Sequence, residues 1–423
     1  MARFLYSLVL LLLLPFAFAW MSWRTLRQTS HGDKLGERFG SYPYLPRNEV
    51  IWLHGASVGE IRAMAPLVKA LRQNFPKHPL LVSSFTGSGR VQAQALFGSQ
   101  ALVAQLPYDL PLCVNRWLKC VSPVIGIIME TEIWPNLFTA CTHRRIPLLL
   151  VSARLSERAL TRYRRLPGLM RSALGQVMAI AAQTQADAEG FRQLGAAPDH
   201  LSVMGNLKFD LQLPDSLLQE GQVLRSKLFN KCTVIVAGST REGEDQQILE
   251  AFRSLLGQHP NCVLVLAPRH PERAASIAEL ISTQGLVCRR RSAGEMPLKA
   301  GEILMLDTLG ELTHFYAAAH VAFVGGSLVE VGGHNLLEPA ALGLPVLAGP
   351  HLDNMRDIAV MLKDAGGLIV VNDAKALGEA FIWLVGNPGT SQHIGQAAQQ
   401  TVIANRGALD KALKLVSSVL NLR

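Results

Sequence analysis

Short apolar runs alternate with amphipathic segments along most of the chain beyond Pro46. The first unit is the clearest. Residues 50–53 form an apolar run, residues 54–59 a turn of small residues, and residues 61–71 carry apolar side chains at helical spacing. Later apolar runs lie at 80–84, 124–129, 147–151 and 178–182. Because repeated strand, turn and helix is typical of βαβ units, we predict a doubly wound, Rossmann-like α/β domain over residues 35–215.

A second series of the same kind follows residues 211–230, which read as helical or irregular. Its apolar runs lie at 233–237, 263–267, 321–324, 345–347 and 367–371. We therefore predict a second Rossmann-like domain over residues 230–423. Open parallel sheets bind ligands outside the carboxyl ends of their strands, so the two domains are expected to present these loops to one shared cleft.

The amino-terminal segment predicts a membrane anchor. Residues 4–23 are 20 consecutive uncharged positions, enough for a helix to span a hydrocarbon core of ~30 Å. A cleavable signal peptide is the alternative, because residues 17–19 read Ala-Phe-Ala. Basic residues follow the run closely at Arg24, Arg27, Lys34 and Arg38. This asymmetry favours a single transmembrane helix over residues 4–23 with the following domains in the cytoplasm.

Composition and absent motifs narrow the class of protein. The chain has 423 residues, 49% hydrophobic and 17% charged, as expected for globular domains. Its net charge of +9 favours partners such as nucleic acid, anionic lipid or a phosphorylated substrate. The six cysteines form no C-x-x-C pair, which argues against a structural metal. No G-x-G-x-x-G follows the first strand and no P-loop is present, so a sugar nucleotide is favoured over NAD or P-loop chemistry.

Three groups of residues in the first domain are candidates for chemistry. Glu60 stands at the start of the first predicted helix, where a carboxylate either accepts a proton from a hydroxyl group or only stabilises the helix end. Glu130 and Glu132 follow the strand at 124–129, and helix capping is the alternative role for Glu132. Lys208 follows the last apolar run of the domain and is either an anion ligand or an ordinary surface lysine.

In the second domain, anion-binding loops are expected at three strand ends. Residues 238–240 offer backbone amides before a helix, and Arg269 stands between two prolines after a strand. A Gly-rich loop over residues 325–334 leads into a helix that carries Asn335 and Glu338 on one face. The order of these segments favours a phosphate and ribose site in this domain.

These motifs resemble those of the bacterial Kdo (3-deoxy-D-manno-octulosonic acid) transferases of lipopolysaccharide biosynthesis. The resemblance covers nearly the whole chain and rests on segments 54–60, 130–136, 153–156, 207–210, 268–273, 310–312 and 325–338. It implies a GT-B fold and transfer of Kdo from CMP-Kdo to the lipid A precursor (lipid IVA), with inversion of the anomeric carbon, at the cytoplasmic face of the inner membrane. No D-x-D-like metal motif stands in the candidate loops, and no cofactor or nucleic-acid partner is expected.

The resemblance also implies roles for individual residues. Glu60 matches the proton acceptor of the family, and Glu130 and Lys208 match positions that stabilise the transition state. The expected CMP contacts are Pro268, Arg269, Leu309, Gly310, Glu311, Asn335, Leu336, Leu337 and Glu338. Arg241 stands where family members often carry His, so the resemblance assigns it no role. The motifs do not encode the number of Kdo residues transferred, the acylation of the acceptor or the oligomeric state.

One basic segment fits a lipid acceptor. Residues 154–171 carry six arginines among leucines and one methionine, a pattern of either a helix docked on anionic inner-membrane lipids or a solvated basic helix. Two other functions stay open on the same fold. A UDP-sugar 2-epimerase accounts for two domains but not for the anchor or the basic helix. A nucleotide-binding scaffold does not account for the ordered carboxylates.

Overall fold

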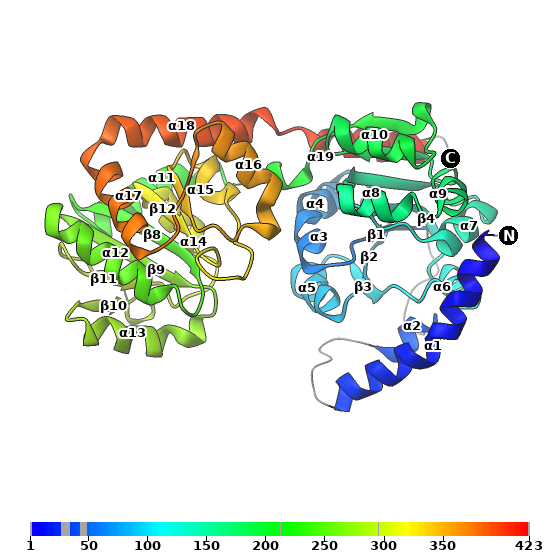
Figure 1. Ribbon diagram of the computed structural model, residues 1–423, viewed down its shortest axis with the longest axis horizontal. Coiled ribbons are helices and arrows are strands. Elements are labelled where there is room, and N and C mark those ends of the chain that lie inside the picture. Colours follow the sequence, from blue (N-terminus) through cyan, green and yellow to red (C-terminus); the bar gives the residue numbers. More distant parts are fainter. Residues whose placement is uncertain (1, 27–33, 43–48, 212, 295, 422–423) are drawn as a thin grey trace. The chain divides into compact units, whose positions relative to one another are not determined.

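The computed structural model describes residues 2–26, 34–42, 49–211, 213–294 and 296–421, and the side chains of residues 17–26 and 35 lie outside this description (Figure 1). The chain forms two compact units. The first comprises Met1–Asp210 and Arg406–Arg423, and the second comprises Leu211–Asn405. Each is an α/β unit around a 7-stranded parallel sheet, which confirms the predicted pair of α/β domains.

The sheet of the first unit has the strand order β3-β2-β1-β4-β5-β6-β7. The strands are β1 (Val50–His54), β2 (Leu80–Ser84), β3 (Leu102–Gln105), β4 (Pro123–Met129), β5 (Leu148–Ala153), β6 (Ala179–Ala182) and β7 (Leu201–Val203). Neighbouring strands are parallel throughout. The chain order reverses between β1 and β4, and open α/β sheets bind ligands at the carboxyl ends of the strands on either side of such a reversal.

Helices cover both faces of this sheet because successive strand residues point to opposite sides. Ile51 and Leu53 pack toward one helical layer, and Val50 and Trp52 pack toward the other. The first layer holds α3 (Val58–Ala63), α4 (Ala65–Asn74), α5 (Gly87–Phe97) and α19 (Ala408–Asn421). The second holds α6 (Pro111–Val121), α7 (Pro135–His143), α9 (Pro167–Leu174) and α10 (Gln185–Gln193), with α8 (Glu157–Tyr163) beside them. Both faces of the sheet are therefore buried, which accounts for its continuous apolar strands.

The second unit repeats the design with the order β10-β11-β9-β8-β12-β13-β14. Its strands are β8 (Thr233–Thr240), β9 (Cys262–Pro268), β10 (Cys288–Arg290), β11 (Ile303–Met305), β12 (Val321–Val324), β13 (Val346–Ala348) and β14 (Leu368–Val370). One face packs against α12 (Asp245–Gln258), α13 (Ala274–Thr283) and α17 (Ala374–Gly386), and the other against α11 (Leu217–Leu228) and α14 (Leu312–Ala318). The helices α15 (Leu337–Ala341), α16 (Arg356–Asp364) and α18 (Pro388–Ala404) complete the unit. Here the chain order reverses between β8 and β12.

Two features differ from the sequence-based expectation. The second domain was expected to run to residue 423, but α19 returns to the first unit, where Ala408, Ala412 and Val416 pack in the core beside α4. Residues 238–240 were expected to form an anion-binding loop, but they are the last residues of β8. Gly238 is required there by close packing, because a Cβ atom would lie 2.1 Å from the Tyr316 hydroxyl group.

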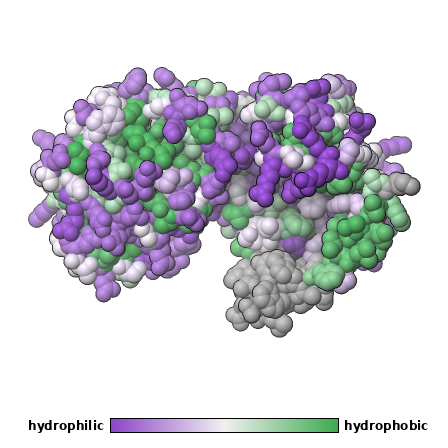
Figure 2. Space-filling model, in the orientation of Figure 1, coloured by the Kyte–Doolittle hydropathy of each residue, from purple (hydrophilic) through white to green (hydrophobic). Residues whose placement is uncertain are grey.

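Helix α1 (Ala2–Leu26) packs on the first unit through a few residues, and α2 (Leu35–Arg38) follows it. Tyr6 packs against the core, and Oγ of Ser7 accepts a hydrogen bond of 2.9 Å from Nδ2 of Asn136 on α7. Several apolar side chains of α1 remain more than half exposed: Phe4, Leu5, Leu11, Leu12, Leu13 and Phe16. Figure 2 shows a hydrophobic patch over this part of the helix.

Across the described residues, the structure contains no helix that is both long and apolar enough to cross a membrane. The side chains of residues 17–23, which belong to the predicted anchor 4–23, lie outside the description. The transmembrane character of this segment therefore stays a prediction.

Candidate active site

The Glu60 carboxylate is fixed at the amino-terminal end of α3, directly after β1. The Ser57 hydroxyl group donates to Oε1 at 2.9 Å, and the Ala56 backbone N–H donates to Oε2 at 2.6 Å. Ser57 in turn caps the helix by accepting from the Glu60 backbone N–H. Gly55 permits this arrangement, because a Cβ atom there would lie 3.0 Å from Cβ of Glu60. The helix-end contacts expected of Glu60 are thus present, and they hold its carboxylate in one orientation.

The electrostatic surroundings of Glu60 suit a proton acceptor. Burial raises the pKa of Glu60, and the negative charge of Glu130 raises it further. Hydrogen bonds from Ala56 and Ser57 and the charge of Lys208 lower it, but less. A raised pKa makes the carboxylate a stronger base. Helix capping and basicity therefore coexist at Glu60, since the capping contacts do not cancel the effect of burial.

Glu130 and Lys208 form an ion pair near Glu60. The Lys208 Nζ atom lies 3.6 Å from Oε1 of Glu130, and both side chains are mostly buried. Glu130 directly follows β4 and has a left-handed backbone with φ of 52°. Such a conformation costs a non-glycine residue about 1 to 2 kcal/mol and is often retained at functional sites. The structure thus brings the three predicted catalytic residues into one electrostatic group: Glu60 follows β1, Glu130 follows β4 and Lys208 follows β7.

Lys208 is positioned by a chain of hydrogen bonds that begins at the backbone of β5. It lies in the short 3₁₀-helix η2 (Leu207–Phe209), whose first turn is capped by Asn206, because Oδ1 accepts from the Lys208 N–H at 2.9 Å. Nδ2 of Asn206 donates to Gln183, whose own side chain donates to the backbone of Ser152 on β5. The surface-lysine interpretation does not fit, because the Lys208 side chain is only 23% exposed and is paired.

Glu132 lies in the same electrostatic group. Burial and then the charge of Glu60 raise the pKa of Glu132 from 4.5 to about 7. The helix that follows, α7, receives its side-chain caps from elsewhere: Asp109 accepts from the backbone N–H groups of Asn136 and Leu137 at 3.0 and 2.8 Å. The helix-capping alternative for Glu132 is therefore wrong, because Asp109 fills that role.

His54, the last residue of β1, is completely buried. Its Nδ1 lies 2.9 Å from Oγ of Ser83, which also accepts from Nε1 of Trp52 at 2.7 Å. Burial lowers the pKa of His54 to about 3, with the charge of Arg38 acting in the same direction. His54 is therefore a neutral structural residue that fixes the strand end before Glu60.

In the second unit, the predicted nucleotide contacts lie at the ends of three strands. Pro268 is the last residue of β9, and the Arg269 N–H donates to the carbonyl of Thr240 on the neighbouring strand at 3.0 Å. The Arg269 guanidinium makes no hydrogen bond or ion pair with any residue that the structure describes. An arginine without a partner at the edge of a parallel sheet is suited to bind an anion.

The loop before α14 is held by one arginine. Nη2 of Arg291 lies 2.7 Å from Oε1 of Glu311, and Thr308 donates its hydroxyl hydrogen to the same carboxylate. These hydrogen bonds, the one from Arg291 foremost, lower the pKa of Glu311. Gly310 has a φ of 86°, and the Leu309 side chain is 79% exposed. Glu311 therefore shapes this loop, and Leu309 offers its side chain to solvent.

The third predicted segment begins α15. Nδ2 of Asn335 donates to Oε1 of Glu338 at 2.9 Å, and Oδ1 of Asn335 accepts from the Leu337 N–H at 3.1 Å. The side chains of Leu336 and Leu337 are buried in the unit. Leu336 and Leu337 are at most 1% exposed, backbone included, so Asn335 and Glu338 are the residues of this predicted set that remain partly exposed.

Glu244, which was not among the predicted site residues, is a buried carboxylate that organises the Gly-rich loop. Its Oε1 accepts from the N–H groups of Ser327 and Leu328 at 2.9 Å each, and its Oε2 accepts from that of Gly326 at 2.6 Å. The only sequence signal was its place in segment 239–244, close after a strand. An acidic residue there reads equally well as an exposed helix-start residue.

The basic segment 154–171 differs from the single amphipathic helix that was expected. It forms α8 and α9, and Leu155, Leu169 and Met170 are buried in the core of the first unit. The arginines on α8 and α9 remain exposed, as does Leu166. The segment is therefore a basic surface without a lipid-facing apolar side of its own.

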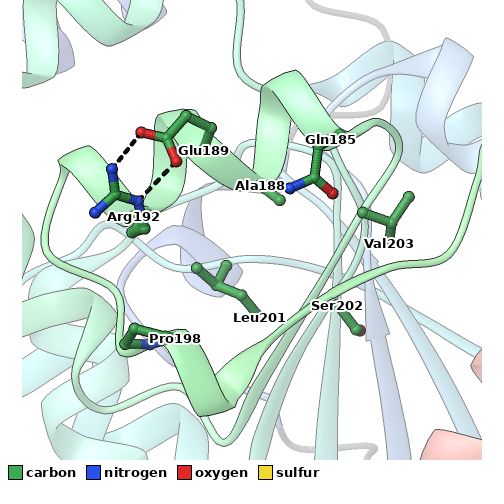
Figure 3. Close-up of a pocket in the computed structure, with 8 residues that line it drawn as sticks. All are labelled: Gln185, Ala188, Glu189, Arg192, Pro198, Leu201, Ser202 and Val203. Carbon is green, nitrogen blue, oxygen red and sulfur yellow. Dashed lines mark hydrogen bonds and ion pairs between the residues drawn. The ribbon is translucent and has the colours of Figure 1, made fainter.

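A surface cavity of about 260 Å³ lies elsewhere on the first unit, between α10 and β7 (Figure 3). It is lined by Gln185, Ala188, Glu189, Arg192, Pro198, Leu201, Ser202 and Val203. None of these was predicted to act in the site, and Glu189 and Arg192 are paired with each other (Figure 3). Over the described residues, no group of three or more His, Cys, Asp or Glu is placed to hold a metal ion.

Comparisons with known proteins match both units. Residues 33–211 match the family model described as 3-deoxy-D-manno-octulosonic-acid transferase (kdotransferase), and residues 225–401 match glycosyl transferases group 1. A 3-deoxy-D-manno-octulosonic acid transferase of Haemophilus influenzae is 36% identical, covering 99% of both chains. The Bordetella pertussis transferase of the same name is also 36% identical, covering 98% of both chains.

Solved structures of similar shape support the fold. A UDP-GlcNAc 2-epimerase from Neisseria meningitidis has a TM-score of 0.55 at 15% identity, covering 88% of this chain and all of its own. A glycosyltransferase from Rickettsia africae has a TM-score of 0.54 at 15% identity, covering 88% and 99%. At such identities the likeness establishes the two-unit GT-B architecture alone. The family follows from the close sequence relatives: the chain belongs to the 3-deoxy-D-manno-octulosonic acid transferase family of glycosyltransferases.

Proposed function

We propose that the protein is an inverting glycosyltransferase that moves Kdo from CMP-Kdo to the lipid A precursor (lipid IVA). The choice of Kdo as the transferred sugar rests on the names of the relatives. The observation that carries the chemistry is the Glu60 carboxylate, which is fixed by two hydrogen bonds and made more basic by burial. A fixed, basic carboxylate is what a single displacement requires to take the proton of an attacking hydroxyl group.

In this mechanism, the hydroxyl oxygen of the acceptor forms a bond to the anomeric carbon while the bond from that carbon to the phosphate oxygen breaks. The proton passes to Glu60, and the bonding electrons leave with CMP. Glu130, whose orientation is set by Lys208 at 3.6 Å, would stabilise positive charge at the anomeric carbon. Arg269, which is unpaired among the described residues, would offset the charge of the departing phosphate.

We further propose that the catalytic part works at the cytoplasmic face of the inner membrane. Support comes from α1, whose exposed Phe4, Leu12 and Phe16 form an apolar surface. Helix α1 also contacts α9, so the exposed arginines of α8 and α9 lie on the same unit near this surface. Apolar side chains beside arginines favour a surface of anionic lipids.

Mass spectrometry of the membrane-bound protein tests whether residues 4–23 remain as an uncleaved anchor: an amino terminus at Met1 agrees with the anchor, and one at Trp20 after cleavage contradicts it.

The reaction is tested by incubating the full-length protein with CMP-Kdo and a tetraacyl lipid A precursor. Mass spectrometry should detect Kdo added to the lipid, and NMR of the product should show the anomeric configuration opposite to that of the donor. Parallel incubations with UDP-sugars test the epimerase alternative. Epimerisation of a UDP-sugar without Kdo transfer would overturn the proposal, and so would CMP binding without any turnover.

A further inference from the structure

Arg241, Arg269 and Arg273 lie close together in the second unit, and they differ in whether a carboxylate offsets their positive charge. Arg273 forms an ion pair with Asp245, which offsets part of its charge. Arg269 has no side-chain partner among the residues that the structure describes. Arg241 is the third member, and neither the motifs nor the resemblance gave it a role.

Strand pairing brings Arg241 and Arg269 to the same edge of the sheet. Thr240 on β8 is the register partner of Pro268 on β9, so the two arginines are the next residues along neighbouring parallel strands. The hydrogen bond of 3.0 Å from the Arg269 N–H to the Thr240 carbonyl fixes this alignment.

The Arg241 guanidinium is oriented by two imidazoles. Its Nε donates to Nε2 of His334 at 3.1 Å, and its Nη1 lies 2.7 Å from Nε2 of His270. Gly326 lets the first histidine approach, since a Cβ atom there would lie 2.8 Å from the His334 ring. An imidazole nitrogen that accepts a hydrogen bond carries no negative charge. These contacts therefore orient the guanidinium without neutralising it.

The buried carboxylate of Glu244, three residues after Arg241, already accepts hydrogen bonds from backbone N–H groups. Glu244 is fully buried and accepts four backbone N–H groups, one from Arg241 itself at 2.8 Å and three from residues 326–328. Glu244 thus offsets the Arg241 charge only in part. In agreement, burial and then the charges of Arg269 and Arg273 lower the pKa of Arg241.

We propose that Arg241 is a second phosphate-binding arginine, which acts together with Arg269 on the phosphate group of the nucleotide donor. This inference rests on the proposed function, which assigns a CMP-linked donor to the second unit. An arginine has five N–H donors, and Arg241 uses two of them on the histidines, so three remain for phosphate oxygens. Its fixed orientation limits the entropy lost on binding.

The test compares the affinities of CMP and cytidine, which differ only in the phosphate group. Calorimetry of the full-length protein gives the CMP affinity, and displacement of CMP gives that of cytidine. Arg241→Gln should weaken CMP binding by about tenfold or more and leave cytidine binding nearly unchanged, because a charge-assisted contact to the phosphate is lost. Arg269→Gln should behave alike, and Arg241→Lys should retain part of the phosphate effect. Arg253→Gln on the exposed side of α12 is the matched control and should change neither affinity.

Two results would overturn the inference while the proposed function stands. One is unchanged CMP affinity in Arg241→Gln when Arg269→Gln has lost it. The other is an equal loss of CMP and cytidine affinity, which would mean that Arg241 only supports the two histidines. If the unaltered protein binds neither CMP nor cytidine, the donor assignment fails and this inference fails with it.

Discussion

Nζ of Lys208 lies 3.6 Å from Oε1 of Glu130, and the two side chains act on Glu60 in opposite directions. Glu130 raises the pKa of Glu60, and Lys208 lowers it. The basicity of the proposed proton acceptor is therefore set by a pair of charges that also hold each other in place. Substitutions in this pair should change both the rate and its dependence on pH.

Lys208→Met should reduce turnover by about 10² or more, because one stabilising charge is lost from the site. The variant also loses the positive charge that lowers the pKa of Glu60. Because the acceptor must be ionised, the acid limb of the pH–rate profile should move to higher pH. Lys119→Met, at an exposed position on α6, is the matched control. If the acid limb of Lys208→Met stays at the same pH, Lys208 does not influence the pKa of Glu60.

The strained backbone of Glu130 predicts an unusual order of stabilities. Because Glu130 has a φ of 52°, glycine at this position avoids about 1 kcal/mol of strain that alanine retains. Glu130→Gly should therefore melt about 2 to 4 °C above Glu130→Ala. Both variants lack the carboxylate and should transfer sugar poorly. At Glu250, exposed on α12, the same two substitutions should give the opposite order, since alanine favours a helix. Equal melting temperatures of the two Glu130 variants would argue against a strained site.

Glu132 should make stability depend on pH. Its pKa is raised from 4.5 to about 7 in the folded protein, so the folded state holds the proton more tightly than the unfolded chain. This contribution to stability is complete below pH 4.5 and is lost as the pH rises through about 7. Glu132→Gln cannot ionise, so its melting temperature relative to the unaltered protein should rise between about pH 5 and pH 8. Glu157→Gln, on the exposed part of α8, should show no such trend. A difference that is flat with pH would exclude burial of an ionised Glu132.

Much of the fold was predictable because both sheets are buried on two faces. Runs such as 80–84 and 321–324 coincide with β2 and β12, since long apolar strands give a clear local pattern. Short strands near a sheet edge escaped prediction. The strand β10 reads Cys-Arg-Arg, and β3 has four residues that no turn motif marks. Their pairing depends on neighbouring strands rather than on local periodicity.

The candidate site was predictable only as far as its residues follow strand ends. Glu60, Glu130 and Lys208 were identified by motif, and the structure brings them together. The role of Glu244 was not predictable, because its partners in the Gly-rich loop lie more than 80 residues away in sequence. The return of α19 to the first unit escaped prediction for a similar reason, since amphipathic spacing does not say which core a helix covers.

Asp210 should prove important for attaching α19. Its Oδ1 accepts from the Gly407 N–H at 2.8 Å, and its Oδ2 accepts from the Leu409 N–H at 2.9 Å. An asparagine has only one acceptor atom there, so Asp210→Asn should lose about 1 to 3 kcal/mol. Hydrogen exchange should become faster for the amides of α19. Asp199→Asn, whose side chain is 81% exposed, is the control. Unchanged exchange in Asp210→Asn would show that apolar packing alone holds α19.

Glu60→Gln tests the proposed mechanism most directly. Glutamine keeps the size of the side chain and one acceptor for the helix-end contacts, but it cannot take a proton. If Glu60 is the proton acceptor, Kdo transfer from CMP-Kdo should fall by about 10² to 10⁴, with CMP affinity retained and a stability loss of up to about 1 kcal/mol. Transfer and thermal melting are measured on the same preparation. A folded Glu60→Gln protein that retains more than about a tenth of the original turnover, against the expected loss of 10², would contradict the account.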